Sequence, residues 1–324
     1  MKSLNFLAII IFSTTIGCAQ DGNSIDYKQE MRNFVQEISE YARKQNPDFI
    51  VIPQNGIQLV SDNGDWNGKP DLDYLNAIDG LGQESLYYGN PGDDKNTPSD
   101  LSEYLEFYLD IANEAGKTIL VTDYTSTPFK MDSSYEWNEY KEYISFAADD
   151  RNLTTIPEYP EVIKDENPNP VNELSDAENF LYLLNPEGFS TKNEFLESIS
   201  ETNYGVVIMD AFYFDTLLTQ TDLNQIRKKA DGGSRLIISY MSIGEAEDYR
   251  YYWQQDWTAG NPEWIVTENP DWEGNYKVKY WDLGWKSYIY GNPESYLQKI
   301  LNSGFDGVYL DIIDAFYYFE ALEN

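Results

Sequence analysis

FDGVYLDIID, residues 305–314, has the composition of a buried β-strand that ends in carboxylates. Side chains alternate across a strand, so Tyr309 and Asp311 share one face and the aliphatic residues beside them share the other. In a barrel of parallel strands the aliphatic face packs on the helices, and the face of Asp311 points inward. A carboxylate there is costly to bury unless it is paired, hydrogen-bonded or used. The stretch therefore predicts a parallel-strand barrel with a functional group at the end of a strand.

Seven other short apolar runs along the chain are typical of buried strands, and helical patterns separate most of them. The expected strands are 49–56, 78–85 and 118–124 before a proline-rich linker at 151–172, and 180–185, 204–210, 235–245, 275–282 and 305–314 after it. Eight alternating strand and helix units are what a (β/α)8 TIM barrel needs, so we predict this α/β fold. The alternative is two separate domains, but a three-stranded half would leave strand edges to be covered.

The composition narrows the classes of function. Of 324 residues, 22 are basic and 56 are acidic, which gives a formal charge of −34. This charge argues against nucleic acid or an anionic membrane as partner and tolerates a cationic one. The chain has no histidine, which excludes serine–histidine triads, histidine-ligated zinc and imidazole acid–base chemistry. Hydrolysis would have to use carboxylates; calcium is a lesser alternative because EF-hand spacing is absent, and we expect no cofactor.

The first residues resemble an export signal. Lys2 is followed by an apolar run at 4–12 that is too short to span a bilayer as a permanent helix. Cys18, the only cysteine, resembles the acylated cysteine of a bacterial lipoprotein. We therefore expect an exported protein, anchored at the cell surface or in the periplasm by a lipid on Cys18, or otherwise secreted. The expected division of the chain is a signal peptide at 1–17, a tether at 18–25 and one barrel domain at 26–324.

Carboxylates gather at the expected strand ends, where TIM barrels place their reactive groups. Six of the eight strand-end residues are acids, although acids are only 56 of the 324 residues. Like charges around one mouth raise the pKa of some members, which provides an acid and a base from one residue type, as glycoside hydrolysis requires. For any one acid a structural role is the alternative. The eight strand-end residues are Asn55, Glu84, Asp123, Asn185, Asp210, Glu245, Asp282 and Asp311, and Asp314 lies just beyond them.

Several long segments resemble one known family. YMSIGEAEDYRYYW (240–253), NYKVKYWD (275–282) and GFDGVYLDIIDAF (304–316) are similar to the bacterial and archaeal branch of glycoside hydrolase family 114. These are TIM-barrel glycosidases related to endo-α-1,4-polygalactosaminidases. The resemblance implies a barrel whose mouth carboxylates hydrolyse a galactosamine-containing polysaccharide.

The order of the segments departs from the family. IPQNG (52–56), IDGLGQESLYYG (78–89) and ILVTDY (119–124) also resemble it, but in the family they follow the segment that is similar to GVYLDIIDA. The order therefore looks circularly permuted, which a closed barrel tolerates because its first and last units are neighbours. If so, residues 305–314 and 49–56 must pair as parallel strands.

The resemblance and the charge together suggest the partner. Partly deacetylated galactosamine polymers are cationic, and an acid-lined mouth suits such a substrate. We expect a polysaccharide or oligosaccharide substrate, no nucleic acid, and contact with a membrane only through a lipid at Cys18. The alternative is a non-catalytic carbohydrate-binding lipoprotein of a glycan-uptake system, which has kept the cleft without the catalytic pair.

The first choices for a catalytic pair are Asp311 and Glu84. Asp311 is chosen because the alternation of side chains points it into the barrel, and Glu84 because it lies in the QESL segment. A neighbouring arginine, Arg250, could fix a carboxylate by a two-pronged contact. The rival catalytic acids are Asp282, Glu245 and Asp210. The candidates for substrate binding are Asn55, Asp123, Tyr124, Tyr240, Glu247, Asp248, Arg250, Trp281, Tyr309 and Asp314.

Overall fold

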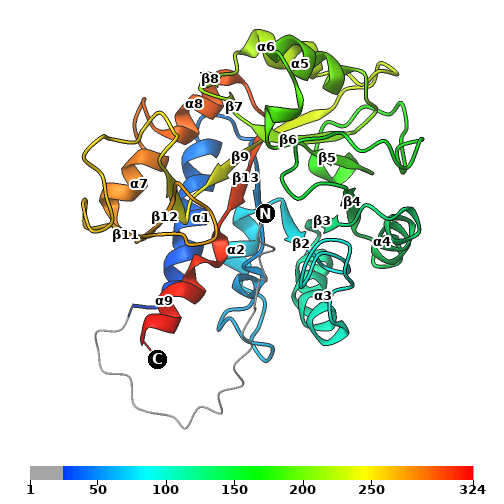
Figure 1. The fold of residues 1–324 in the computed structure, drawn as a ribbon. Helices are drawn as coiled ribbons and strands as arrows, with labels where there is room; N and C mark the ends of the chain where they lie inside the picture. Colours follow the sequence, from blue (N-terminus) through cyan, green and yellow to red (C-terminus); the bar gives the residue numbers. More distant parts are fainter. Residues whose placement is uncertain (1–24, 324) are drawn as a thin grey trace.

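The computed structural model describes residues 25–323, and parallel strands wrapped by helices form its centre (Figure 1). The expected signal peptide and Cys18 lie outside the described residues. Within 25–323 no helix is both long and apolar enough to cross a bilayer. The helices are α1 (Tyr27–Arg43), α2 (Leu72–Ala77), α3 (Ser99–Glu114), α4 (Pro128–Tyr140), α5 (Lys192–Ser200), α6 (Gln220–Ile226), α7 (Leu283–Ile289), α8 (Tyr296–Ser303) and α9 (Phe316–Glu323).

The parallel strands of the described chain fall into two hydrogen-bonded sheets, ordered β1-β13-β9-β6-β5 and β2-β3-β4. One apolar core runs through both sheets and the helices around them. The strands of the larger sheet are β1 (Ile50–Pro53), β13 (Gly307–Asp311), β9 (Leu236–Ser242), β6 (Val206–Asp210) and β5 (Phe180–Tyr182), and those of the smaller sheet are β2 (Gly80–Glu84), β3 (Thr118–Tyr124) and β4 (Ile144–Ala148).

The two sheets approach each other at both ends. At one joint the Asn55 N–H donates to the Gly82 carbonyl at 2.8 Å, so β1 and β2 nearly continue the ladder. At the other joint β4 and β5 lie side by side, with the rings of Phe146 and Phe180 5.7 Å apart, but no ladder joins them in residues 25–323. The α/β class and the parallel strands are confirmed, whereas one continuous closed sheet is not observed.

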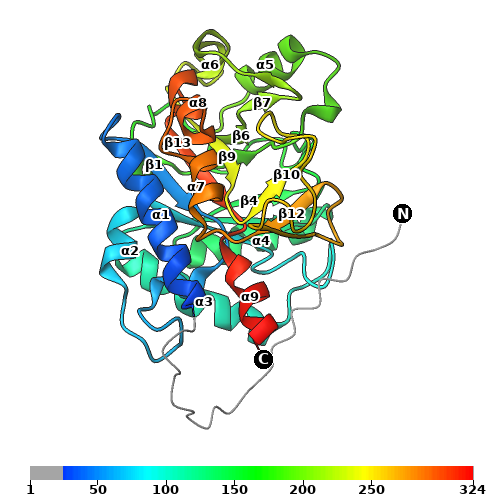
Figure 2. The same cartoon turned by 90° about the vertical axis from the view of Figure 1, so that its left-hand side faces the viewer.

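The predicted pairing of the two ends of the chain is confirmed. β1 and β13 are parallel neighbours, with Ile50 opposite Gly307. On the outside, α9 lies beside the start of α1 (Figure 2): the Tyr27 hydroxyl donates to Glu323 Oε1 at 2.8 Å, and the Tyr27 ring stacks on Phe319 at 5.5 Å. The first and last units of the described chain are therefore neighbours, as a circular permutation requires.

One predicted barrel strand was wrong and another was missed. Residues 275–282 do not join the parallel strands; β12 (Asn275–Val278) pairs antiparallel with β10 (Glu245–Glu247) and β11 (Ile265–Glu268) in a side sheet. The missing parallel strand is β4, which pairs with β3. Polar and apolar residues alternate in NYKVKY, which is typical of a half-exposed antiparallel strand, whereas the run ISFAA has the apolar character of a buried parallel one.

The proline-rich segment 151–172 contains no helix or strand. Its end is attached to the body: the Lys229 ammonium donates to the Asn169 carbonyl at 2.7 Å, and the Val171 N–H donates to the Ser234 carbonyl at 3.0 Å. Val162, in contrast, is 64% exposed. A break in the chain near Val162 would therefore disturb few contacts.

We predict that the chain can be reopened in this segment. A variant with new termini between Glu161 and Val162, and with residues 26 and 323 joined by a flexible linker, should keep the same fold because Tyr27 and Glu323 already touch. Circular dichroism should match the natural protein, and Tm should change by less than about 5 °C. A matched variant opened between Tyr309 and Leu310, inside β13, should not fold. An unfolded or aggregated first variant would contradict the prediction.

Candidate active site

Glu84 and Asp311 come together at the carboxyl ends of β2 and β13. One nitrogen of Gln54, Nε2, donates to Oε2 of Glu84 and to Oδ1 of Asp311, both at 3.0 Å. Because both oxygens lie on the same nitrogen, they are at most about 6 Å apart, a spacing at which two carboxylates can act on one glycosidic bond. Gln54 follows β1 directly, so three adjacent strands build the pair.

Each carboxylate also accepts a hydrogen bond from a tyrosine on a neighbouring strand. Tyr240 in β9 donates to Oδ2 of Asp311 at 2.8 Å, and Tyr124 at the end of β3 donates to Oε1 of Glu84. Asn55 adds a further donor, from Nδ2 to Oε2 of Glu84 at 2.9 Å. Hydrogen bonds are directional, so these donors hold both carboxyl groups in fixed positions.

The backbone turns sharply directly after the strands that carry the pair. Asn55, Ser85 and Ile312 adopt φ of 60°, 55° and 59°. This left-handed region is unusual for a β-branched residue such as Ile312. The turn lets the Ile312 N–H donate to Oδ1 of Asp311 at 2.8 Å. Backbone strain of this kind concentrates at functional sites, and here it orients the carboxylate.

Burial and like charge favour the protonated forms of two carboxyl groups in the site, Asp311 and Asp314. Desolvation, followed by the charge of Glu84, raises the pKa of Asp311 to about 8. Burial, with the charges of Glu84 and Glu245, raises the pKa of Asp314 to about 6; Asp314 lies in the short 3-10 helix η4 (Ile313–Ala315). At neutral pH Asp311 therefore holds a proton.

Tyr309 fills the space between the two parallel sheets below the pair. Its ring is fully buried and meets Tyr182 edge to face at 5.3 Å. Its hydroxyl occupies the space that the absent side chain of Gly82 leaves, since a Cβ there would lie 1.9 Å away from it. The prediction that Tyr309 contacts the substrate is wrong, because the ring is closed off from solvent and supports the pair from inside.

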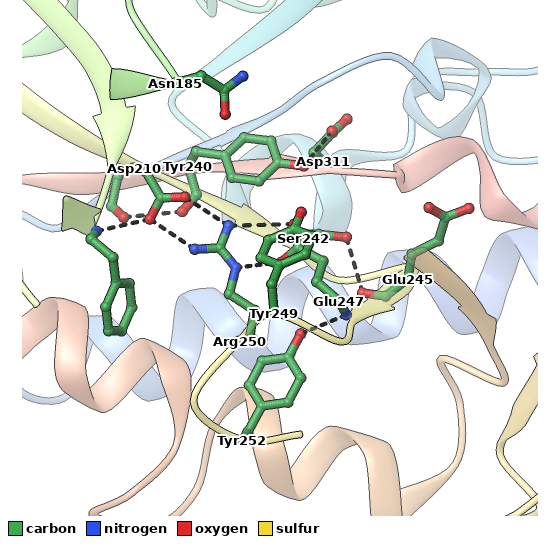
Figure 3. Close-up of polar contacts among 12 residues, drawn as sticks. Asn185, Asp210, Tyr240, Ser242, Glu245, Glu247, Tyr249, Arg250, Tyr252 and Asp311 are labelled. Atoms are coloured by element: carbon green, nitrogen blue, oxygen red, sulfur yellow. Dashed lines mark hydrogen bonds and ion pairs between the residues drawn. The ribbon is translucent and has the colours of Figure 1, made fainter. Parts of the chain in front are cut away.

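A second polar cluster surrounds Arg250 beside the pair (Figure 3). Arg250 Nη1 donates to Oδ1 of Asp210 at 2.9 Å, and Nη2 lies 2.7 Å from Oδ2. Its Nε donates to Oε2 of Glu247 at 2.7 Å, and the Tyr249 hydroxyl donates to Oε1 of Glu247 at 2.6 Å. The predicted two-pronged contact is present, and it joins Arg250 to both carboxylates. Asp210 and Glu247 are therefore held in ion pairs, which favours a supporting role for Asp210 over catalysis.

Glu245, at the start of β10, lies close to Asp314 rather than in the pair. Its Oε1 accepts from Lys277 Nζ at 3.1 Å and from Asn269 Nδ2 at 2.9 Å, whereas the buried Oε2 has no partner among the residues described. The preceding residue, Gly244, packs so tightly that a Cβ would lie 2.2 Å from the Ile312 carbonyl oxygen. Glu245 and Asp314 thus add negative charge on the same side of the mouth.

Asp282 does not flank Asp311, although 275–282 and 305–314 were predicted as consecutive strands of the barrel, which would place Asp282 beside Asp311. Its Oδ1 accepts from the Gly284 N–H at 2.7 Å, which makes Asp282 the N-cap of α7. The error follows from the wrong strand at 275–282. The true neighbour of Asp311 on that side is Ser242 of β9.

Two other predicted binding residues face away from the pair. Asp123 is buried on the helix-facing side of β3, where it accepts from the Ser134 hydroxyl at 2.7 Å and from the Tyr87 N–H at 2.9 Å. Trp281 packs on Tyr27 and Phe319 near the ends of the chain, with ring centroids 5.1 and 4.7 Å apart. Both side chains therefore have structural roles.

Two predicted residues lie at the margin of this region. Asp248 is largely exposed after β10. Its partial desolvation, with the charges of Glu268 and Glu273, raises its pKa. Asn185 follows β5 and donates to the Asn152 carbonyl at 2.6 Å. No group of three or more potential metal ligands occurs among residues 25–323.

Sequence reasoning missed Gln54, the residue that joins the pair. Asn55 was taken as the end of the first strand, but Gln54 is the side chain that reaches both carboxylates. The signal was available, because Gln54 is a polar residue at the end of a buried apolar run. Only the pairing of β1 between β13 and β2 shows which carboxylates it meets.

Comparisons with known proteins find one family and several relatives. Residues 187–324, which include β6, β9 and β13, match the model of Glycoside-hydrolase family GH114. An uncharacterized protein of Methanocaldococcus jannaschii is 41% identical over 130 residues, which cover 40% of this chain and 36% of that protein. An uncharacterized protein of Deinococcus radiodurans is 39% identical over 121 residues, which cover 37% of this chain and 37% of that protein. An uncharacterized protein of Thermotoga maritima is 38% identical over 120 residues, which cover 37% of this chain and 36% of that protein. The chain thus spans little more than a third of the length of these relatives.

Proposed function

We propose that the protein is a glycosidase of glycoside hydrolase family GH114, the family whose model matches residues 187–324, and that it acts through Glu84 and Asp311. The observation that carries the proposal is the bridge from Gln54 Nε2 to both carboxylates at 3.0 Å. The resulting separation of at most about 6 Å fits the roughly 5–5.5 Å of retaining enzymes better than the roughly 6.5–9.5 Å of inverting ones.

In the proposed mechanism Asp311 is the general acid and Glu84 is the nucleophile. The Asp311 proton passes to the glycosidic oxygen as the bond to the anomeric carbon breaks, and Glu84 attacks that carbon to form a glycosyl-enzyme ester. Asp311, now a carboxylate, then takes a proton from a water molecule that attacks the same carbon and releases Glu84. The cycle ends with the proton back on Asp311.

We further propose a galactosamine-containing polysaccharide as substrate, with cleavage like that of endo-α-1,4-polygalactosaminidases. The formal charge of −34 favours a cationic polymer. Near the pair, Asp314 lies partly open to solvent, and the negative charge of Glu245 acts on it from the buried side. An ammonium group placed there would gain charge-assisted hydrogen bonds. Tyr249, which is 55% exposed, offers an aromatic face for a sugar ring at the same mouth.

Digestion of α-1,4-linked galactosamine polymers of graded acetylation tests this function. We expect new reducing ends, faster release from deacetylated polymer, and slower release at high salt, because salt screens the attraction between the chains. Fragments of intermediate length would indicate endo cleavage. Asp311→Asn is the matched inactive control. If the polymer binds but no amino-sugar polymer is cleaved, the carbohydrate-binding alternative is supported instead.

We also propose that the protein is exported and anchored by a lipid on Cys18. The support is the sequence pattern of Lys2, the apolar run 4–12 and the single cysteine. Palmitate labelling that is lost in Cys18→Ala would agree with the anchor. A mature N-terminus beyond Cys18 would rule it out.

A further inference from the structure

Arg151 lies on the ring of Tyr124, on the side of the site that holds Glu84. Its guanidinium carbon is 3.9 Å from the centre of that ring. Nη2 donates to the Gly89 carbonyl at 2.7 Å, and Nε donates to Oδ1 of Asp93 at 2.5 Å. Three contacts therefore fix a guanidinium that is only partly exposed.

Tyr124 connects this arginine to the carboxylate pair. Its ring is buried, and its hydroxyl donates to Oε1 of Glu84. Burial and the charge of Glu84 raise the pKa of Tyr124 well above its usual range, and the positive charge of Arg151 opposes the rise. A cation on the face of a phenol draws electron density toward itself, so the hydroxyl becomes a better donor.

The tyrosine that serves Asp311 has a different environment. Tyr240 is buried, and after burial the largest causes that raise its pKa are the negative charges of Asp311 and Glu247. No cation lies over its ring among the residues that the structure describes. The two tyrosine–carboxylate contacts thus differ in the arginine that lies over Tyr124.

We propose that Arg151 is a positioning residue that acts through Tyr124: it clamps the phenol ring and strengthens the hydrogen bond to Glu84. The hydrogen bond fixes the orientation of the Glu84 carboxylate toward the sugar. This inference rests on the proposed role of Glu84 as nucleophile. The other polar groups on Glu84 and the titratable groups around it and Tyr124 include Gln54, Asn55, Tyr182, Tyr309, Asp311 and Asp314.

The test combines Arg151→Met with Tyr124→Phe. Methionine keeps the length of the side chain and removes its charge. We expect kcat to fall about 10-fold and KM to change less than about 2-fold. Arg151→Lys should retain part of the rate. In the Tyr124→Phe background, Arg151→Met should have little further effect, because the hydroxyl through which it acts is gone.

Arg227→Met is the matched control. Arg227 pairs with Asp306, which directly precedes β13 at the opposite end of that strand from Asp311, so its loss should leave kcat and KM unchanged. Circular dichroism shows whether each variant is folded. A full Arg151→Met effect that persists in Tyr124→Phe, or a change in KM alone, would mean that Arg151 contacts the substrate, and it would overturn the proposal.

A readout without turnover separates this inference from the proposed function. The 13Cζ NMR signal of Tyr124, assigned through Tyr124→Phe, should shift in Arg151→Met and stay in place in Arg227→Met. If that signal shifts but no glycan is cleaved, the glycosidase proposal fails while the contact stands. If the signal does not move, the coupling of Arg151 to Tyr124 is refuted whatever the activity.

Discussion

Asp311→Asn and Glu84→Gln are each expected to lower kcat by at least about 1,000-fold while the protein stays folded. Asparagine cannot donate the proton that Asp311 supplies, and glutamine cannot attack the anomeric carbon. Both replacements keep the size of the side chain and can accept from Gln54 Nε2, which holds each carboxylate at 3.0 Å. Initial rates on the galactosamine polymer, with circular dichroism on the same samples, measure the loss.

The two substitutions should fail at different steps. An aryl glycoside with a good leaving group needs little protonation, so Asp311→Asn should still form the glycosyl-enzyme and accumulate it. Azide, which needs no general base, should then release the sugar with retained configuration. Glu84→Gly should instead yield an azide product of inverted configuration. The same product from both variants would contradict the assigned roles.

Asp282→Asn is the matched control for this experiment. Asp282 caps α7 through the Gly284 N–H, and asparagine is an equally good N-cap. Neither turnover nor Tm should change appreciably. If Asp282→Asn costs as much activity as Asp311→Asn, or if Asp311→Asn or Glu84→Gln keeps full activity, the assignment of the pair is wrong.

The sequence predicts well those features that are set within a single strand, such as the direction of each side chain. The alternation in GVYLD places Asp311 inward because alternation is a property of the extended backbone itself. The same rule separates Tyr124, which reaches Glu84, from Asp123, which faces the helices. Strict parity in TILVTDY therefore allowed only one of these two residues at the mouth, although both were predicted there.

The features predicted poorly depend on which strands are neighbours. Asp282 was placed beside Asp311 because 275–282 was counted as a barrel strand, but the register puts Ser242 there. Gln54 meets both carboxylates only because β1 lies between β13 and β2. Such contacts arise from topology, and no local pattern in the chain specifies them.

The circular permutation stays a prediction with two supporting observations. β1 and β13 pair in parallel, as it requires. The family match begins at residue 187, after the proline-rich segment 151–172. A collinear comparison can align only one of two exchanged pieces, so a permuted chain should match over part of its length, as observed.

Asp311→Asn should also stabilise the protein, and only above about pH 4. The folded state raises the pKa of Asp311 from 3.8 to about 8. Between these values the unfolded chain has released the proton that the folded protein keeps, so the folded state binds more protons and stability falls as pH rises. This loss of unfolding free energy is absent below about pH 4 and complete above about pH 8. Asparagine has no proton to lose, so the variant does not lose this unfolding free energy at any pH.

Denaturant unfolding at about pH 4 and about pH 8 measures the effect. The full shift sets an upper limit of about 6 kcal/mol, and partial contact with water reduces the expected gain at the higher pH to about 1–3 kcal/mol. Glu84→Gln should give part of the same gain, because it removes the charge that opposes ionisation of Asp311. Asp282→Asn should give none. If Asp311→Asn is no more stable than the natural protein at about pH 8, Asp311 is not held protonated by the fold, and the general acid must be another group.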